Sequence, residues 1–173
     1  MLMNQSQLKP KQQIAHVLYH ALIHNLQSAI CNGTRVAEST IMDPLRILLV
    51  DDSAEFLESA ARLLMLHQEL CIVGRAASGS SALEQVAVLH PDLVLMDLAM
   101  PGMNGLETTR QIKAQPDAPR VVIMTLYDVA EYRTAARNAT ADGFIAKSSI
   151  RSQLLPLLAV LFPNPSVDGE QPE

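Results

Sequence analysis

The chain has 173 residues, of which 49% are hydrophobic and 18% are charged, and its formal net charge is −5. This composition is typical of a folded protein and argues against wholesale disorder. No long basic run indicates a nucleic-acid surface. No uninterrupted apolar run reaches about 18 residues, so we expect no membrane span. The length suits one domain plus an appendage.

Residues 1–44 are interpreted as an N-terminal extension. Apolar side chains recur at helical spacing over residues 14–30 and predict an amphipathic helix, and residues 31–44 look like a linker. His16, His20 and His24 recur every four residues on another face of that helix. Such spacing can chelate a transition metal, but a solvated or dimer-packing stripe is the favoured interpretation. The histidines interrupt what would be a signal peptide, so we expect a cytoplasmic protein.

From residue 45 to residue 162, short apolar runs alternate with helical patterns. The expected strands are 45–50, 71–76, 93–96, 121–124 and 143–146, and the expected helices are 53–67, 78–90, 104–116, 128–138 and 149–162. Asn104 with Glu107, and Asp128 with Glu131, resemble capping pairs for two of these helices. Pro156 is expected to kink the last helix or to delay its start. Residues 163–173 are expected to form a frayed tail.

Strands that alternate with helices predict an α/β domain over residues 45–162, with a parallel sheet covered on both faces. Ligands bind such sheets at the carboxyl ends of the strands. Four of the apolar runs place polar or charged side chains at that edge: Asp51, Asp52, Asp97, Thr125 and Lys147. Clustered carboxylates raise one another's pKa, and a hard divalent cation relieves their repulsion. Oxygen ligands with room for water favour Mg²⁺.

The same side chains suit phosphoryl transfer. A carboxylate such as Asp97 can form an acyl phosphate as a covalent intermediate. The transfer needs a metal, a cation and a hydroxyl donor around the phosphoryl oxygens, and Lys147 and Thr125 supply the last two. Each residue taken alone has an ordinary structural interpretation. Their joint placement at the strand ends favours the phosphoryl chemistry.

The segments LLVDDS, LVLMDLAMPGMNGLE, IMT and DGFIAK occur in this order and resemble the response-regulator receiver domain of two-component signalling. The resemblance implies a flavodoxin-like, CheY-like, doubly wound five-stranded parallel sheet with strand order 2-1-3-4-5. Most receivers have proline after the lysine, whereas here Ser148 follows Lys147. The sequence resembles the NarL/FixJ-type subgroup in three places: this Lys-Ser pair, the DGFIAKSS phrase and the preceding TLYD.

The resemblance implies a role for each residue at the acidic end of the sheet. Asp97 would be the phosphoacceptor. Asp52 would bind Mg²⁺ directly, Asp51 would bind it directly or through water, and Asp97 and the backbone carbonyl of Ala99 would complete the protein ligands.

The resemblance also implies which residues sense and tune the phosphoryl group. Thr125 and Lys147 would contact it, and Phe144 matches the aromatic residue that turns when the domain switches. Ala99 and Tyr127 flank the phosphorylation site at positions that tune self-dephosphorylation in the family.

The implied function is that of a phosphorelay response regulator, not an enzyme, with a sensor histidine kinase or a phosphotransfer protein as its phosphoryl donor. The switching surface would comprise the fourth helix (128–138), the fifth strand (143–146) and the fifth helix (149–162), which is the α4-β5-α5 face of the family. This face includes Tyr132 and is a candidate partner or homodimer surface. NarL/FixJ-type proteins usually carry a C-terminal helix-turn-helix, and the chain stops before one could begin, so direct DNA binding is not expected.

Three other classes of protein share part of this pattern. A haloacid-dehalogenase-like phosphatase also uses an aspartyl nucleophile, but it requires an Asp-x-Asp signature, and Ala99 stands where the second acid would be. A flavodoxin-like nucleotide binder requires a Gly/Ser/Thr-rich loop after the first strand, where Asp51 and Asp52 lie instead. A pseudo-receiver, which binds partners without phosphorylation, is the alternative that stays open.

Overall fold

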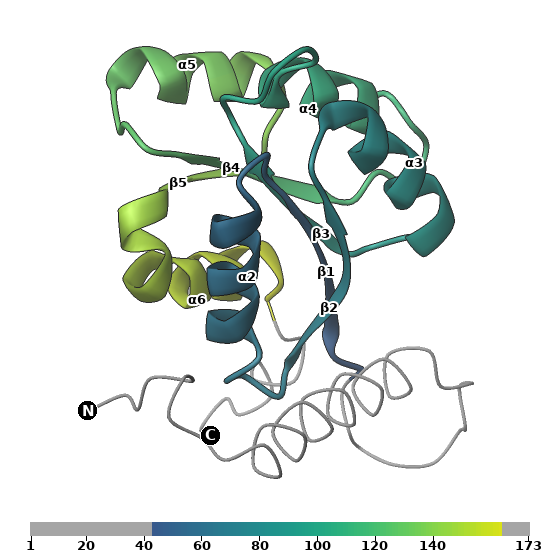
Figure 1. Ribbon diagram of the computed structural model, residues 1–173, viewed down its shortest axis with the longest axis vertical. Helices are drawn as coiled ribbons and strands as arrows, with labels where there is room; N and C mark the ends of the chain where they lie inside the picture. Colours follow the sequence, from purple (N-terminus) through teal and green to yellow (C-terminus); the bar gives the residue numbers. More distant parts are fainter. Residues whose placement is uncertain (1–42, 164–173) are drawn as a thin grey trace, which may run out of the picture. The chain divides into compact units, whose positions relative to one another are not determined.

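Five parallel strands form one sheet in the order β2-β1-β3-β4-β5 in the computed structural model, which describes residues 43–163 (Figure 1). The strands are β1 (Leu45–Val50), β2 (Leu70–Ala76), β3 (Leu93–Asp97), β4 (Arg120–Thr125) and β5 (Gly143–Ala146). The predicted flavodoxin-like fold and strand order are confirmed. Residues 1–42 and 164–173 lie outside the described part of the chain, and with them the predicted helix at 14–30 and its histidines.

Helices cover both faces of the sheet. They are α2 (Ala54–Leu64), α3 (Gly79–Leu89), α4 (Gly105–Lys113), α5 (Ala130–Asn138) and α6 (Ile150–Leu161), and the short 3₁₀ turn η2 (Lys147–Ser149) precedes α6. In Figure 1, α2 and α6 lie on one face, and α3, α4 and α5 lie on the other. This arrangement buries the sheet between two helical layers, which explains why the strands are continuous apolar runs rather than alternating ones.

Two hydrophobic clusters form the core, one on each face of the sheet. Along β1, Ile47 and Leu49 belong to the cluster that α2 and α6 complete, whereas Leu48 and Val50 belong to the cluster that α3, α4 and α5 complete. All four side chains are fully buried. Successive residues of a strand point to opposite faces, so one six-residue strand contributes to both clusters.

Side-chain caps fix the starts of three helices. Ser53 Oγ accepts a hydrogen bond from the Phe56 N–H at 3.2 Å, and Asn104 Oδ1 accepts one from the Glu107 N–H at 2.9 Å. Ser78 caps α3 in the same way. These bonds satisfy backbone donors that the first helical turn leaves free. The predicted cap at Asn104 is therefore correct.

The structure contradicts one sequence prediction about a helix start and one of the two alternatives given for Pro156. Asp128 does not cap α5, whose N-cap residue is Val129 with no side-chain hydrogen bond. The Asp128 carboxylate pairs instead with Arg133, because a guanidinium offers two charge-assisted donors where a helix terminus offers single amides. Pro156 does not delay α6, which begins at Ile150. Ile150, Leu154 and Leu158 are buried against the sheet, and their packing holds the helix despite the proline.

Gly105 allows α4 to begin directly against β3. A Cβ atom at this position would lie 1.9 Å from the carbonyl oxygen of Asp97, so only glycine fits. The Gly105 N–H donates to the Leu98 carbonyl at 3.1 Å. The close approach fixes the turn that follows the phosphoacceptor candidate.

Replacing Gly105 with alanine should lower the free energy of unfolding by about 2–3 kcal/mol, because backbone atoms cannot move aside as a flexible side chain can. Urea unfolding measures the change. Gly102→Ala is the matched control: no atom lies within 4 Å of its Cβ position, and its φ of 74° alone predicts a smaller loss of about 1 kcal/mol. Equal losses in the two variants would contradict the steric explanation.

Candidate functional site

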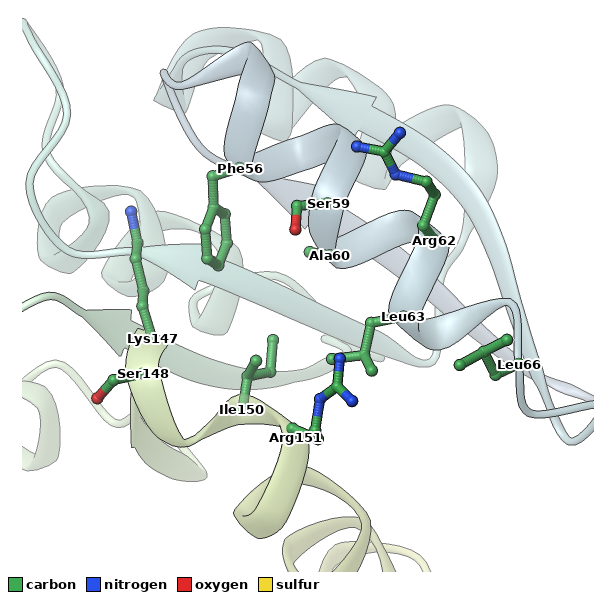
Figure 2. Close-up of a pocket in the computed structure, with 10 residues that line it drawn as sticks. All are labelled: Phe56, Ser59, Ala60, Arg62, Leu63, Leu66, Lys147, Ser148, Ile150 and Arg151. Atoms are coloured by element: carbon green, nitrogen blue, oxygen red, sulfur yellow. The ribbon is translucent and has the colours of Figure 1, made fainter. Parts of the chain in front are cut away.

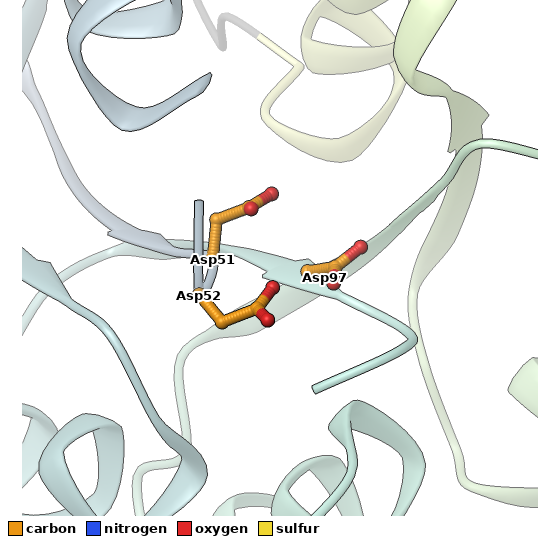
Figure 3. A group of neighbouring side chains, drawn as sticks. All are labelled: Asp51, Asp52 and Asp97. Carbon is orange, nitrogen blue, oxygen red and sulfur yellow. The ribbon is translucent and has the colours of Figure 1, made fainter. Parts of the chain in front are cut away.

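Strand register brings three carboxylates together at the carboxyl ends of β1 and β3. Val50 pairs with Met96, so Asp51 and Asp97, which follow them, lie side by side. Asp52 is the next residue along the chain. One carboxylate oxygen from each aspartate lies within 4.8 Å of those of the other two, and Figure 3 shows the three side chains next to one another.

Lys147 joins the two buried carboxylates. Its Nζ lies 2.6 Å from Asp51 Oδ2 and 2.9 Å from Asp97 Oδ1. Asp51 is fully buried, the Asp97 residue is 3% exposed, and Asp52 is exposed. The Ser53 N–H donates to the other Asp51 oxygen at 3.0 Å. Lys147 is therefore the cation that makes the burial of two adjacent negative charges tolerable.

The pKa of Asp97 is raised above the usual range of an aspartate. Burial is the main cause, and the charges of Asp51 and Asp52 add to it, against the opposing effect of Lys147. The pKa of Lys147 is also raised: burial by itself lowers it, but the contacts with Asp51 and Asp97 outweigh that effect. The lysine thus stays protonated while Asp97 holds its negative charge at an energetic cost.

Asp142 shows the opposite balance at the other end of the sheet. Its carboxylate accepts hydrogen bonds from Lys113 at 2.9 Å, from Arg120 at 2.7 Å and from the Val121 N–H at 2.8 Å. Burial tends to raise the pKa of Asp142, but these donors bring it below the usual range. The negative charge of Asp142 is stabilised by its hydrogen-bond donors, which fits a structural role. The negative charge of Asp97 is disfavoured by its surroundings, as is common for carboxylates at reactive sites.

A pocket adjoins the acidic site on the side of α2 and α6. Figure 2 shows the residues that line it. Most come from α2, η2 and α6, and they include Phe56, Leu63, Arg151 and Lys147. The Lys147 Nζ lies 4.6 Å from the centre of the Phe56 ring, within reach of a cation–π attraction. Lys147 therefore contacts both the carboxylates and an aromatic wall. Phe56 was not among the site residues predicted from the sequence.

Thr125 ends β4 on the same edge of the sheet, and its partner in β5 is Ala146, the residue before Lys147. The Thr125 side chain is buried, and its Oγ1 accepts a hydrogen bond from the Tyr127 N–H at 3.2 Å. Tyr127 is 70% exposed, and Ala99 is exposed in the loop that follows β3. Both residues flank the acidic site in sequence, as the resemblance implies, and their rate-tuning role stays a prediction.

Phe144 lies in β5, half-buried against the core cluster that α3, α4 and α5 complete. The guanidinium carbon of Arg133 lies 5.1 Å from the centre of its ring. Arg133 was not among the predicted site residues. An arginine in a short helix has no periodic signal that would place it over a ring ten or so residues further along the chain, so only the structure shows this contact.

The acidic cluster fits a magnesium ion. Three carboxylates face one ammonium group, which leaves two negative charges, and a divalent cation neutralises that number. Carboxylate oxygens are the ligands that Mg²⁺ prefers, and the exposed Asp52 leaves room for the water molecules that this ion retains. Among the described residues, this is the only group of three or more possible ligand side chains close enough to share an ion.

The comparisons with known proteins agree with this geometry. Residues 47–159 match the family model described as response regulator receiver domain. That match covers more than half of the chain, and the chain therefore belongs to the response regulator receiver family. The family as a whole is characterised by phosphorylation and Mg²⁺ binding at an acidic pocket.

Particular relatives belong to the NarL/FixJ type and to other receiver-containing proteins. The nitrate/nitrite response regulator protein NarL of Escherichia coli is 34% identical over 116 residues, which cover 67% of this chain and 54% of that protein. The chain thus spans about half the length of that relative. A solved LuxR-family two-component response regulator from Aurantimonas sp. is 32% identical with a TM-score of 0.64, covering 68% of this chain and 84% of the other.

An enzyme also contains a similar segment. The protein-glutamate methylesterase/protein-glutamine glutaminase of Geobacillus kaustophilus is 39% identical over 109 residues, which cover 62% of this chain but 31% of the enzyme. The similarity falls on the receiver, a signalling module, and not on the whole enzyme. Within residues 43–163, no helix has the length and apolar character needed to cross a membrane.

The affinity for Mg²⁺ should fall as the pH is lowered, beginning at a higher pH than an ordinary aspartate would give. Protons compete with the metal for the Asp97 carboxylate, whose pKa is raised by burial and by its acidic neighbours. Below that pKa the affinity should drop by up to about tenfold per pH unit. Calorimetric titration at several pH values measures it. Asp97→Asn should flatten this dependence, and an unchanged profile in that variant would assign it to another group.

Proposed function

We propose that the chain is a phosphorelay response regulator in which Asp97 accepts a phosphoryl group from a histidine kinase or a phosphotransfer protein in the presence of Mg²⁺. One observation carries the proposal: the buried Asp97 carboxylate lies 2.9 Å from a lysine ammonium and beside two further carboxylates. A nucleophile, a cation and metal ligands thus converge at one edge of the sheet.

The proposed reaction moves the phosphoryl group from a phosphohistidine nitrogen to a carboxylate oxygen of Asp97. The P–O bond forms as the P–N bond breaks, and the departing imidazole takes up a proton. Hydrolysis of the resulting acyl phosphate returns Asp97 and releases inorganic phosphate. Catalysis of both steps rests on positioning and on stabilisation of charge on the phosphoryl oxygens.

Each residue of the site has a role in this proposal. Asp51, Asp52, Asp97 and the Ala99 carbonyl would hold Mg²⁺, which neutralises the negative charge of the incoming group. Lys147 already contacts Asp97, which supports the proposal that it would bind a phosphoryl oxygen there. Chemistry of this kind depends on cations that are in place before the reaction begins, so little reorganisation is needed during transfer.

Phosphorylation would then act on the face formed by α5, β5 and α6, which is the α4-β5-α5 face of the family. Thr125 would turn its hydroxyl from Tyr127 to the phosphoryl group, and Phe144 would move into the space that Thr125 leaves. Ala99 and Tyr127 would tune the rate of dephosphorylation. Tyr132 is exposed on α5 within this face, and Leu126 is exposed in the loop that leads to α5, which supports a role in partner binding or homodimerisation.

The proposal divides the chain into an extension at 1–44, a receiver at 45–162 and a tail at 163–173. It places the protein in the cytoplasm with a kinase or phosphotransfer protein as its donor, and it gives the described residues no direct contact with DNA. A pseudo-receiver with constitutive partner binding is the competing reading that the following experiments separate from it.

Asp97→Asn should abolish phosphorylation, because an amide oxygen cannot form a stable acyl phosphate. Intact mass is measured after incubation with a small-molecule phosphodonor, with and without Mg²⁺. Wild-type protein should gain one phosphoryl adduct that depends on Mg²⁺. A wild-type level of adduct on Asp97→Asn would refute the assignment, and no adduct on the wild type would favour the pseudo-receiver.

Lys147→Ala should slow phosphorylation on the order of a hundredfold, as expected when one preorganised charge contact is lost. The same variant should bind Mg²⁺ more tightly, because a competing cation leaves the Asp51 and Asp97 carboxylates. Lys113→Ala is the matched control, since that lysine pairs with Asp142 away from the site. Slower phosphorylation together with weaker Mg²⁺ binding would indicate a collapsed site and not a lost phosphoryl contact.

A further inference from the structure

Arg133 links the loop after β4 to the aromatic ring of Phe144. The Arg133 Nε donates to Asp128 Oδ1 at 2.6 Å, and its Nη2 donates to the other oxygen of the same carboxylate. The guanidinium carbon lies 5.1 Å from the centre of the Phe144 ring. Three residues from the loop, α5 and β5 are thus joined through one side chain.

The two-point bond fixes the orientation of the guanidinium. A carboxylate that accepts two parallel N–H bonds holds the guanidinium plane in a set direction, which a single bond would not do. The pKa of Asp128 is lowered, first by its hydrogen bond with Arg133, and the pKa of Arg133 is raised by the same bond. Both groups are therefore charged throughout the neutral range, so the pair does not titrate there.

The anchor of this pair lies on the segment that phosphorylation is proposed to move. Asp128 follows Thr125 by three residues, in the loop that separates β4 from α5. The Thr125 hydroxyl is held within that loop by the backbone of Tyr127. A turn of Thr125 toward a phosphoryl group would break this hydrogen bond and so free the loop backbone that carries the Asp128 carboxylate.

We propose that Arg133 is a positioning residue that holds the Phe144 ring where it lies in the unphosphorylated chain, and that movement of the loop carrying Asp128 releases it. The inference rests on the proposed function, because it concerns the switch of that same site. In the resting state the Phe144 ring is then held by two contacts, the guanidinium over its face and the apolar packing beneath it.

The effect on the switch follows from linkage. A contact made in the resting state alone biases the equilibrium against the active state, and a ligand that favours the active state then binds less tightly. The Arg133 side chain is 46% exposed, so the contact has the strength of a surface cation–π pair. Removing such a pair should shift the equilibrium about two- to fivefold.

The test uses beryllium fluoride, a noncovalent mimic of the phosphoryl group, with the full chain at saturating Mg²⁺. Calorimetric titration gives its apparent affinity for wild-type protein and for Arg133→Gln, which should bind about two- to fivefold more tightly. Arg137→Gln is the matched control, because it removes the same charge one turn further along α5. The Arg137→Gln variant should bind beryllium fluoride with the affinity of the wild type.

Two further variants separate the ring contact from a general effect of charge or stability. Arg133→Lys keeps the charge but loses the two-point bond, so it should lie between the wild type and Arg133→Gln. In a Phe144→Leu background, Arg133→Gln should produce no further gain. If the Asp128–Arg133 pair had only a structural role, its loss would leave the affinity for beryllium fluoride unchanged or would weaken it.

The outcomes are distinct. If the Arg133→Gln variant binds beryllium fluoride with the same affinity as Arg137→Gln, or less tightly, the inference is overturned while the proposed function stays in place. A gain that persists in the Phe144→Leu background also overturns it, because the ring would then play no part. Wild-type protein that does not bind beryllium fluoride refutes the proposed function itself, and the inference falls with it.

Discussion

Two buried carboxylates share one ammonium group at the carboxyl edge of the sheet, and this shared contact governs the charge balance of the site. Asp51 and Asp97 end adjacent strands, and each would be costly to bury alone. Lys147 contacts both from the end of β5, at 2.6 and 2.9 Å. β5 is at the sheet edge, and β3 and β4 lie between it and β1. The strand order and the length of the lysine side chain must therefore match for this contact to form.

Much of the fold was predictable because its signals are local. Apolar runs with no alternation indicate strands buried on both faces, and a polar residue at the end of each run indicates the edge where ligands bind. Asn104 behaves as its local sequence predicts. The strand order came from resemblance to a family, since composition and periodicity do not determine which strands are neighbours.

The errors and omissions have one physical origin. Each side chain has several possible contact partners, and the sequence does not show which of them lies close to it in the fold. Asp128 was predicted to cap a helix, but the guanidinium of Arg133 is the stronger donor within reach. The alternative that Pro156 delays the start of α6 failed because the packing of α6 against the sheet was unknown. The contacts of Phe56 with Lys147 and of Arg133 with Phe144 likewise depend on how separate elements face one another.

Lys147 is also the first residue of η2, the turn that leads into α6. The α6 helix packs in the core on one face of the sheet, whereas Phe144, three residues before Lys147, packs on the opposite face. If Asp97 accepts a phosphoryl group as we propose, the change of charge would reach one helical layer through the backbone of Lys147 and the other through Thr125 and the Phe144 ring. Under the proposed function, two surfaces on opposite sides of the domain would report the same chemical event, and two different partners would have separate places to bind.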